Sequence, residues 1–269
     1  MSKRILDCLI FMVLLSLVSC SDRKQEQGHI GEDSTEKEVI PFYYNTKYGL
    51  IDSNRNVIVN PVEAIHLMSM VDGAAVVVTK EFHRKVIDCN GNVIAEHFWD
   101  CGRNFSEGLL PIKFRDRSGF INNRGDFVFE CPISLDYYGY EQSPKGYPNL
   151  ECSFSEGLAY VPASATEWNI YDKEGTCLAE GLQFIPKMHS VFRKGLLCVY
   201  DKDGTRNYGY IDKYGKLIIP FMFTQAEDFS SGYAMVVYNG KDALVDTEGN
   251  VFYSEDIIAG NKAPAFFRQ

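Results

Sequence analysis

Four tyrosines in one irregular segment are the side chains of this chain best suited to contact a ligand. They lie between Pro132 and Glu151 and are Tyr137, Tyr138, Tyr140 and Tyr147. Exposed tyrosines on a loop held by a rigid scaffold form a flat, amphipathic surface that suits a sugar ring or a protein partner. The alternative is that they pack over the hydrophobic edge of a neighbouring sheet. The residue types alone favour neither interpretation.

Two cysteines stand at the two ends of this insertion. A disulfide between Cys131 and Cys152 would close a loop of about twenty residues and contribute roughly 3 kcal/mol in the chain-entropy model. It would also restrict the tyrosines before any ligand arrives, which lowers the ordering cost of binding. The alternative is two unpaired thiols at the ends of strands.

Residues of catalytic type occur without the spacing that catalysis needs. Glu107 and Glu156 recur at equivalent places in a repeated turn, which favours a structural role over an acid and base pair. The chain has no Gly-x-Ser-x-Gly elbow, no His-Glu-x-x-His pattern and no Gly-rich phosphate loop, and its five histidines are scattered. We therefore expect no enzyme, no metal site and no cofactor. An enzyme built from irregular loops is the less favoured alternative.

A smaller aromatic group lies in the second repeat. It comprises His97, Phe98, Trp99 and Asp100. We expect this group to pack, because an apolar side chain is expected between the strands at that point.

A repeated hairpin pattern must position all these residues. Six strand-like runs end on Asp or Asn, and a Gly follows three residues later in five of them. The Asp and Asn positions are Asp52, Asp88, Asn122, Asp172, Asp212 and Asp246, separated by 36, 34, 50, 40 and 34 residues. Asp at the first position of such a turn accepts hydrogen bonds from the turn backbone, and Gly takes the positive φ. Arg55 replaces Gly in the first copy, so that turn needs either a left-handed Arg or another geometry.

A second pattern of Phe, two variable residues and Gly precedes an apolar strand in each unit. The copies begin at Phe105, Phe154, Phe192 and Phe229, with a looser one at Met70. Two residues and four residues after the Gly, each strand carries small, aliphatic or β-branched side chains. This spacing of two puts them on one face, which we expect to be packed.

These two patterns together resemble the WG-repeat family, also called KWG repeats. The resemblance is most specific for residues 208–220 followed by Phe229 to Ala234, and it extends over residues 40–253. The Trp-Gly pair itself is replaced by Tyr48-Gly49 and Tyr208-Gly209. The resemblance implies an all-β repeat module of the kind found in envelope-associated bacterial proteins, and the family has no defined catalytic residues.

The ends of the array suggest how it is completed. The apolar segment 39–43 precedes the first hairpin, and Val251 to Tyr253 closes the last. If segment 39–43 completes the sheet of the C-terminal hairpin, the array is a closed, six-bladed, propeller-like ring without exposed sheet edges. The alternative is an open β-superhelix in which these segments are caps.

The N-terminal residues predict a secreted and lipid-anchored protein. Lys3 and Arg4 precede a short apolar run, and residues 17–20 resemble the signal box of a bacterial lipoprotein, with Cys20 as the acylated residue. We expect residues 1–19 to be a signal peptide, 20–38 a lipidated tether, 39–253 the repeat domain and 254–269 a tail. The predicted location is the cell envelope, at the outer membrane, on its periplasmic or surface side.

The charge of the mature chain bears on its partners. Without residues 1–19 it carries 25 basic and 35 acidic residues, a formal net charge of -10. Binding to nucleic acid requires a basic face, so a nucleic-acid partner is not expected. The expected partners are the membrane, through the anchor, and a protein, with a glycan or peptidoglycan as the alternative.

Overall fold

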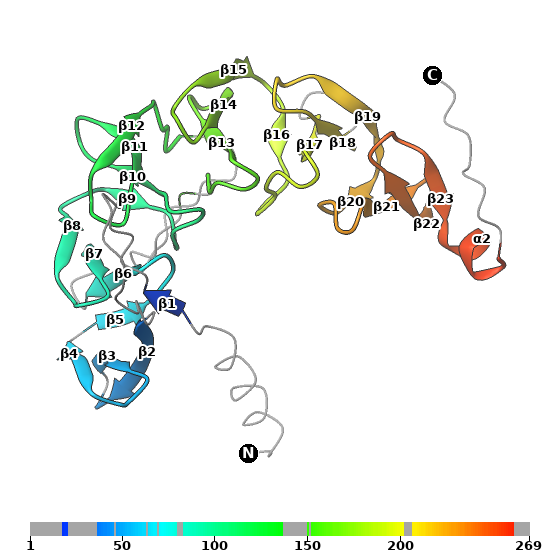
Figure 1. The fold of residues 1–269 in the computed structure, drawn as a ribbon. Coiled ribbons are helices and arrows are strands. Elements are labelled where there is room, and N and C mark those ends of the chain that lie inside the picture. The colour runs from blue at the N-terminus through cyan, green and yellow to red at the C-terminus, as the bar shows by residue number, and fades with distance from the viewer. Residues whose placement is uncertain are drawn as a thin grey trace, which may run out of the picture. The chain divides into compact units, whose positions relative to one another are not determined.

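The computed structural model of the chain describes residues 18–20, 37–45, 47–62, 64–68, 70–79, 83–136, 150, 152–201 and 206–260. Within these ranges the chain forms six small sheets of consecutive strands and one short helix, α2 (Ser254–Ile258) (Figure 1). The predicted all-β architecture of tandem hairpin repeats is therefore confirmed. No helix in the described ranges has the length and apolar character needed to cross a bilayer.

The strands of the first three sheets follow in chain order. They are β1 (Val18–Cys20), β2 (Lys37–Tyr44), β3 (Lys47–Asp52) and β4 (Val57–Val62); β5 (Ala64–Leu67), β6 (Ala74–Thr79), β7 (Arg84–Asp88) and β8 (Val93–Glu96); and β9 (Asp100–Cys101), β10 (Leu110–Lys113), β11 (Ser118–Ile121) and β12 (Phe127–Glu130). The other three sheets are β13 (Leu158–Pro162), β14 (Trp168–Asp172) and β15 (Cys177–Leu182); β16 (Ile185–Pro186), β17 (Leu197–Tyr200), β18 (Tyr208–Ile211) and β19 (Leu217–Phe223); and β20 (Gln225–Ala226), β21 (Tyr233–Tyr238), β22 (Lys241–Asp246) and β23 (Val251–Tyr253).

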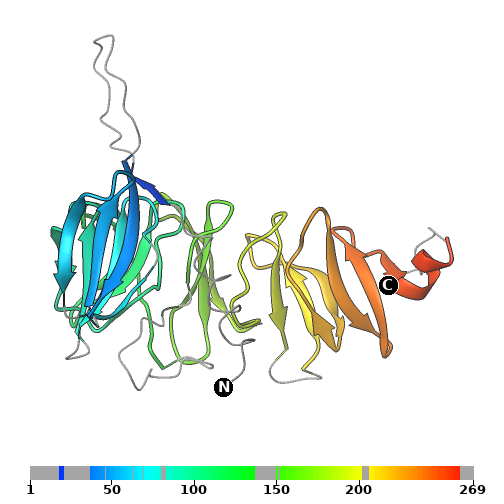
Figure 2. The same ribbon diagram turned by 90° about the horizontal axis from the view of Figure 1, so that it is seen from below.

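The chain divides into two compact units, each described by itself. The first comprises residues 1–116, 120–127 and 142–150, and the second comprises residues 117–119, 128–141 and 151–269. The second unit contains the last three sheets, which follow one another in chain order from β13 to β23 (Figure 2). It also contains the candidate site described below.

The expected pairing at the ends of the array is wrong. Strand β2 does not complete the sheet of the C-terminal hairpin; it pairs with β3 from Val39 opposite Asp52 to Tyr44 opposite Lys47. The sheet of the C-terminal hairpin is instead completed by β20 and β21, which immediately precede it. Pairing of consecutive strands closes shorter loops and so loses less chain entropy. Closure of the six sheets into a ring stays a prediction.

The turns that follow the Asp and Asn positions have the predicted chemistry. In the fifth sheet the Gly215 N–H donates to the Asp212 carbonyl (3.0 Å), and the Asp212 carboxylate accepts from the Lys216 N–H (2.9 Å). The first copy keeps this geometry, because the Arg55 N–H donates to the Asp52 carbonyl (2.9 Å). Arg55 adopts φ 68°, so the left-handed Arg is the alternative that the structure selects.

The glycine of the Tyr-Gly pairs is required by the approach of the next strand. A Cβ on Gly209 would lie 2.6 Å from the carbonyl oxygen of Ile219, at a register shift between β18 and β19. A Cβ on Gly49 would similarly lie 2.7 Å from the carbonyl oxygen of Val59. Both contacts are with backbone atoms, so rotation of a side chain cannot relieve them.

The expected packed face of the apolar strands is confirmed. All its predicted residues are buried: Ala75, Val77, Leu110, Ile112, Ala159, Val161, Leu197, Val199, Ala234 and Val236. In the second unit both faces of the fifth sheet are covered, because Leu197 packs in one cluster with β13 and Cys198 in another with β21. The outer face of β21 differs, since Tyr233 is 45% and Met235 65% exposed.

Candidate functional site

The Phe-x-x-Gly pattern forms a tight hairpin turn at the start of each inner strand. In the fifth sheet, the Arg193 N–H donates to the Leu196 carbonyl (2.9 Å) and the Leu196 N–H to the Arg193 carbonyl (3.1 Å). The two central residues, Lys194 and Gly195, have φ values of 56° and 73°. Two consecutive left-handed residues define a type I′ turn, which suits the twist of a hairpin. The N–H groups of these two residues are therefore not used within the hairpin.

A carboxylate from the preceding turn binds those N–H groups. Glu156 accepts from the Lys194 N–H with Oε1 (2.8 Å) and from the Gly195 N–H with Oε2 (2.7 Å). In the first unit, Asp72 Oδ2 likewise accepts from the Gly108 N–H (2.7 Å). The structural role predicted for Glu156 is thus confirmed: it joins one turn to the next.

The environment of Glu156 favours its ionised form. Burial alone would raise the pKa of this carboxyl group, but the two backbone N–H donors, together with the charges of Arg193 and Lys194, outweigh burial and lower the pKa. Hydrogen bonds donated to a carboxylate stabilise its charged form.

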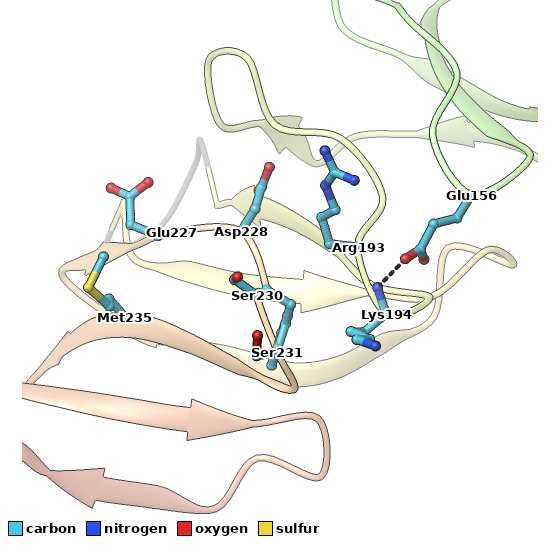
Figure 3. Close-up of a pocket in the computed structure, with 9 residues that line it drawn as sticks. Glu156, Arg193, Lys194, Glu227, Asp228, Ser230, Ser231 and Met235 are labelled. Carbon is cyan, nitrogen blue, oxygen red and sulfur yellow. Dashed lines mark hydrogen bonds between the residues drawn. The ribbon is translucent and has the colours of Figure 1, made fainter. Parts of the chain in front are cut away.

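A cleft of about 600 Å³ opens beside these turns (Figure 3). Its lining comes from three consecutive turns, the segment before the last of them, and strand β21. The lining residues are Glu156, Arg193, Lys194, Glu227, Asp228, Phe229, Ser230, Ser231 and Met235. All of them belong to the second unit.

The acidic residues of the cleft are held by contacts within the protein. Asp228 accepts hydrogen bonds from the Ser190 hydroxyl and from the Val191 N–H (3.2 Å). Glu227 forms an ion pair with Lys187. These carboxylates fix the walls of the cleft, because each is already occupied by a donor of the protein.

The basic residues of the cleft are differently placed. Arg193 and Lys194 lie near enough to Glu156 to lower its pKa, but among the described residues neither forms a salt bridge. Figure 3 shows the Arg193 side chain extending between Asp228 and Glu156. Two cationic groups are therefore available on the cleft surface.

The apolar part of the cleft has a rigid floor and an exposed rim. Phe229 is 4% exposed, and its ring centroid lies 4.9 Å from that of Tyr210. The Tyr210 hydroxyl donates to the Glu227 carbonyl (2.7 Å), which fixes the backbone beside the cleft. Met235 stands at the rim and is largely exposed. A thioether is polarisable and adapts to different contacting surfaces.

Several residues that the sequence singled out lie outside the described part of the structure. Tyr137, Tyr138, Tyr140 and Tyr147 lie outside the described residues. Cys20 ends strand β1, and its side chain is likewise outside the described part. The lipid anchor and the tyrosine surface stay predictions.

The predicted disulfide is not formed in the structure. Cys131 and Cys152 are both buried and both are thiols. The base of the insertion is tied instead through Ser118, whose hydroxyl donates to the Cys131 carbonyl (2.8 Å) and accepts from the Ile133 N–H (3.0 Å). The Ser118 hydroxyl therefore fixes the backbone at the start of the insertion.

The smaller aromatic group is only partly packed. Phe98 is buried as expected, but Trp99 is 57% exposed. Its backbone is fixed, since the Trp99 N–H donates to the Lys113 carbonyl (2.7 Å) and Arg84 donates to the Trp99 carbonyl. The expectation of packing fails for Trp99 because successive residues of an extended segment point to opposite sides.

Reasoning from the sequence missed the cleft. Its signal is a reversal of charge within the repeated turn, where Lys194 occupies the place of Asp72, Glu107 and Glu156. This reversal of charge is visible in the sequence, but its consequence depends on the contact between successive turns, which only the structure shows.

Comparisons with known proteins support the repeat. The model of the WG-containing repeat family matches residues 208–241, which confirms the resemblance for the repeat that contains Asp212. Among solved structures, the chain is similar to BamB from Moraxella catarrhalis, at a TM-score of 0.46 and 12% identity over 82% of this chain and 73% of that one. It is also similar to the WD40 β-propeller domain of Doa1, at a TM-score of 0.34 and 13% identity over 67% and 64% of the two chains. These likenesses concern the fold alone. No curated protein sequence matches the chain.

Proposed function

We propose that this protein is a non-catalytic binding module that holds a protein partner on its β-repeat scaffold. The observation that carries the proposal is the cleft beside the turns of the second unit. It combines two available cations with an exposed Met235, while its acidic groups are bound within the protein. Such a mixed surface on a rigid support suits a polypeptide ligand.

A binding role fits the state of the polar groups better than catalysis does. General acid and base chemistry needs a carboxylate or imidazole directed at a reacting group. In the cleft, Glu156 and Asp228 instead accept hydrogen bonds from the backbone. The nine lining residues include no His and no Cys that would serve as base or nucleophile.

We further propose that the module is displayed from the bacterial envelope by an acyl anchor on Cys20. The support is the sequence of the first twenty residues, in which a basic start and a short apolar run lead to the signal box at residues 17–20. A single anchoring segment of this kind needs no spanning helix. Strand β1 includes the last two residues before the proposed cleavage point, so processing would remove most of that strand.

Parallel capture experiments test the proposed function. Full-length protein, solubilised in detergent, would be used to capture partners from an envelope-protein fraction and, separately, from a glycan and peptidoglycan fraction. Met235→Asp should abolish capture of the protein partner, because it places a charge on the exposed rim of the cleft. Met188→Asp is the matched control, since Met188 is 67% exposed but does not line the cleft.

Two outcomes would contradict the proposal. If both variants captured the protein partner as well as the unchanged protein does, the cleft would not be the site of binding. Capture of glycan alone would establish the alternative, a glycan-binding module. In that case joint substitution of Tyr137, Tyr138 and Tyr140 by Ala tests whether the insertion forms the glycan surface.

A further inference from the structure

Successive turns of this protein are linked by a repeated carboxylate contact. The first central residue of one type I′ turn reaches the backbone N–H groups of the next. Glu156 binds both N–H groups of the turn at Lys194 and Gly195, at 2.8 and 2.7 Å. Asp72 makes the same kind of contact with Gly108 in the first unit. The chain itself therefore shows what these N–H groups bind: a carboxylate.

The series is interrupted at the last turn. Its central residues, Ser231 and Gly232, have φ values of 53° and 90°, so the turn has the same conformation as those before it. The residue placed to reach it is Lys194, at the position that Glu156 holds one unit earlier. An ammonium group has three donors and no acceptor, so it cannot replace the carboxylate. Among the described residues, the backbone N–H groups of Ser231 and Gly232 have no acceptor.

These vacant donors belong to the cleft. Ser231 and Lys194 both line it, and Figure 3 shows that they come from two different turns. Arg193, from the same turn as Lys194, adds a second cation. Backbone donors that converge beside a cation form a site for an anion.

We propose that the Ser231–Gly232 turn and Lys194 bind a carboxylate supplied by the protein partner. This inference rests on the proposed function and names the group that the cleft recognises. One carboxylate accepts from both backbone N–H groups, as Glu156 does one unit earlier, while the Lys194 ammonium neutralises its charge. The partner thus completes the series of carboxylate contacts that the chain leaves unfinished.

The neighbouring acidic residues do not oppose this assignment. Asp228 is bound by Ser190 and Val191, and Glu227 is paired with Lys187. The charge of Glu227 is thereby compensated by Lys187, and both carboxylate oxygens of Asp228 accept from neutral donors of the protein. The exposed Met235 offers an apolar contact for the part of the partner that carries the carboxylate.

Restoring the missing carboxylate is the sharpest test. In Lys194→Glu, the new side chain should bind the Ser231 and Gly232 N–H groups, as Glu156 binds the turn before. Hydrogen exchange of the segment 229–234 in the full-length protein should then slow by roughly tenfold, about the effect of one hydrogen bond to a charged acceptor. Lys216→Glu is the matched control, because it makes the same change of charge at an exposed residue outside the cleft. Exchange that is unchanged in Lys194→Glu, or slowed equally in both variants, would overturn the proposal.

Binding is measured with defined probes. Two short peptides of glycine and alanine would be titrated into the wild-type protein: one with a single Glu and an amidated C-terminus, the other with a C-terminal carboxylate and no acidic side chain. Slower exchange of residues 229–234 with the first identifies a side-chain carboxylate, and with the second a chain terminus; either supports the site. Lys194→Glu should abolish the response. No response to either peptide, or an equal response to inorganic phosphate, would refute carboxylate recognition.

The two proposals fail separately. If partner capture depends on Met235 but is unaffected in Lys194→Glu, the proposed binding function is supported and the carboxylate site is refuted. If the peptides bind at the turn but Met235→Asp leaves partner capture unchanged, the carboxylate site is supported and the proposed role of the cleft in partner binding is refuted.

Discussion

Substitution of Gly209 by Ala should destabilise the second unit, because the added methyl group meets backbone atoms. The Cβ would lie 2.6 Å from the Ile219 carbonyl oxygen and 3.0 Å from the carbonyl carbon and oxygen of Pro220. Strands β18 and β19 would have to separate where their register shifts, between Tyr208 and Ile211. A side-chain rotation would not relieve any of these contacts.

The magnitude follows from two opposed effects. Inserting a methyl group into a packed region costs about 1–3 kcal/mol. Replacing Gly by Ala restricts the unfolded chain and returns about 0.4–1 kcal/mol where the native conformation permits it. The close backbone contacts place Gly209 at the upper end of the first range, so we expect a net loss of about 2 kcal/mol. With a urea dependence of about 3 kcal/mol per molar, the midpoint should fall by roughly 0.7 M.

Tryptophan fluorescence provides the assay. Trp168 is 1% exposed and packs in one cluster with Leu197 and Ile211, the residue two after Gly209. A Trp99→Phe background removes the other tryptophan, since the chain contains two. Urea unfolding of this background with and without Gly209→Ala then reports on the second unit.

The sixth sheet supplies the matched control. Ala243 lies three residues before Asp246, as Gly209 lies three before Asp212, but the pairing of β22 with β23 has no register shift. Ala243→Gly should therefore lower stability by the general cost of glycine in a strand, about 0.5–1 kcal/mol, together with the loss of one buried methyl group. If Gly209→Ala shifted the midpoint no more than Ala243→Gly, the steric explanation of this glycine would be wrong.

Three further predictions concern the turns and the anchor. Arg55→Gly should raise the urea midpoint by an amount equivalent to at most about 1 kcal/mol, because Gly accepts the φ of 68° without the left-handed strain of Arg; a lower midpoint would contradict this. The pKa of Glu156 is lowered in the folded state, so the stability it adds over Glu156→Gln should be present above its ordinary pKa of 4.5 and disappear as the pH falls below it; unfolding curves at pH 7 and pH 3 that show the same difference would refute it. Cys20→Ser should release the protein from membranes into the soluble fraction, and retention on membranes in high salt would exclude the acyl anchor.

Local chemistry in the sequence determined the repeat. An Asp whose carboxylate accepts from the following turn, and a Gly that takes positive φ, act within five residues, so their recurrence was enough to predict six hairpins and their packed strand faces. The sequence also predicted the choice at the Arg55 turn, between a left-handed Arg and another turn geometry, because that choice depends on the φ of one residue. The same reasoning failed for segment 39–43, whose partner strand depends on pairing between segments and not on the residues of one turn.

Only the tertiary structure decided what the turns do to one another. Glu156 and Lys194 occupy equivalent places in the sequence, yet one completes a contact with the next turn and the other leaves it open. Gly209 likewise has no special role within its own strand; the carbonyl of Ile219 excludes any side chain there. Such effects arise from atoms that approach across strands and turns, at distances of a few ångströms that the order of residues does not encode. The sequence by itself thus determined the repeat and its turn chemistry, while packing between repeats decided where the cleft forms.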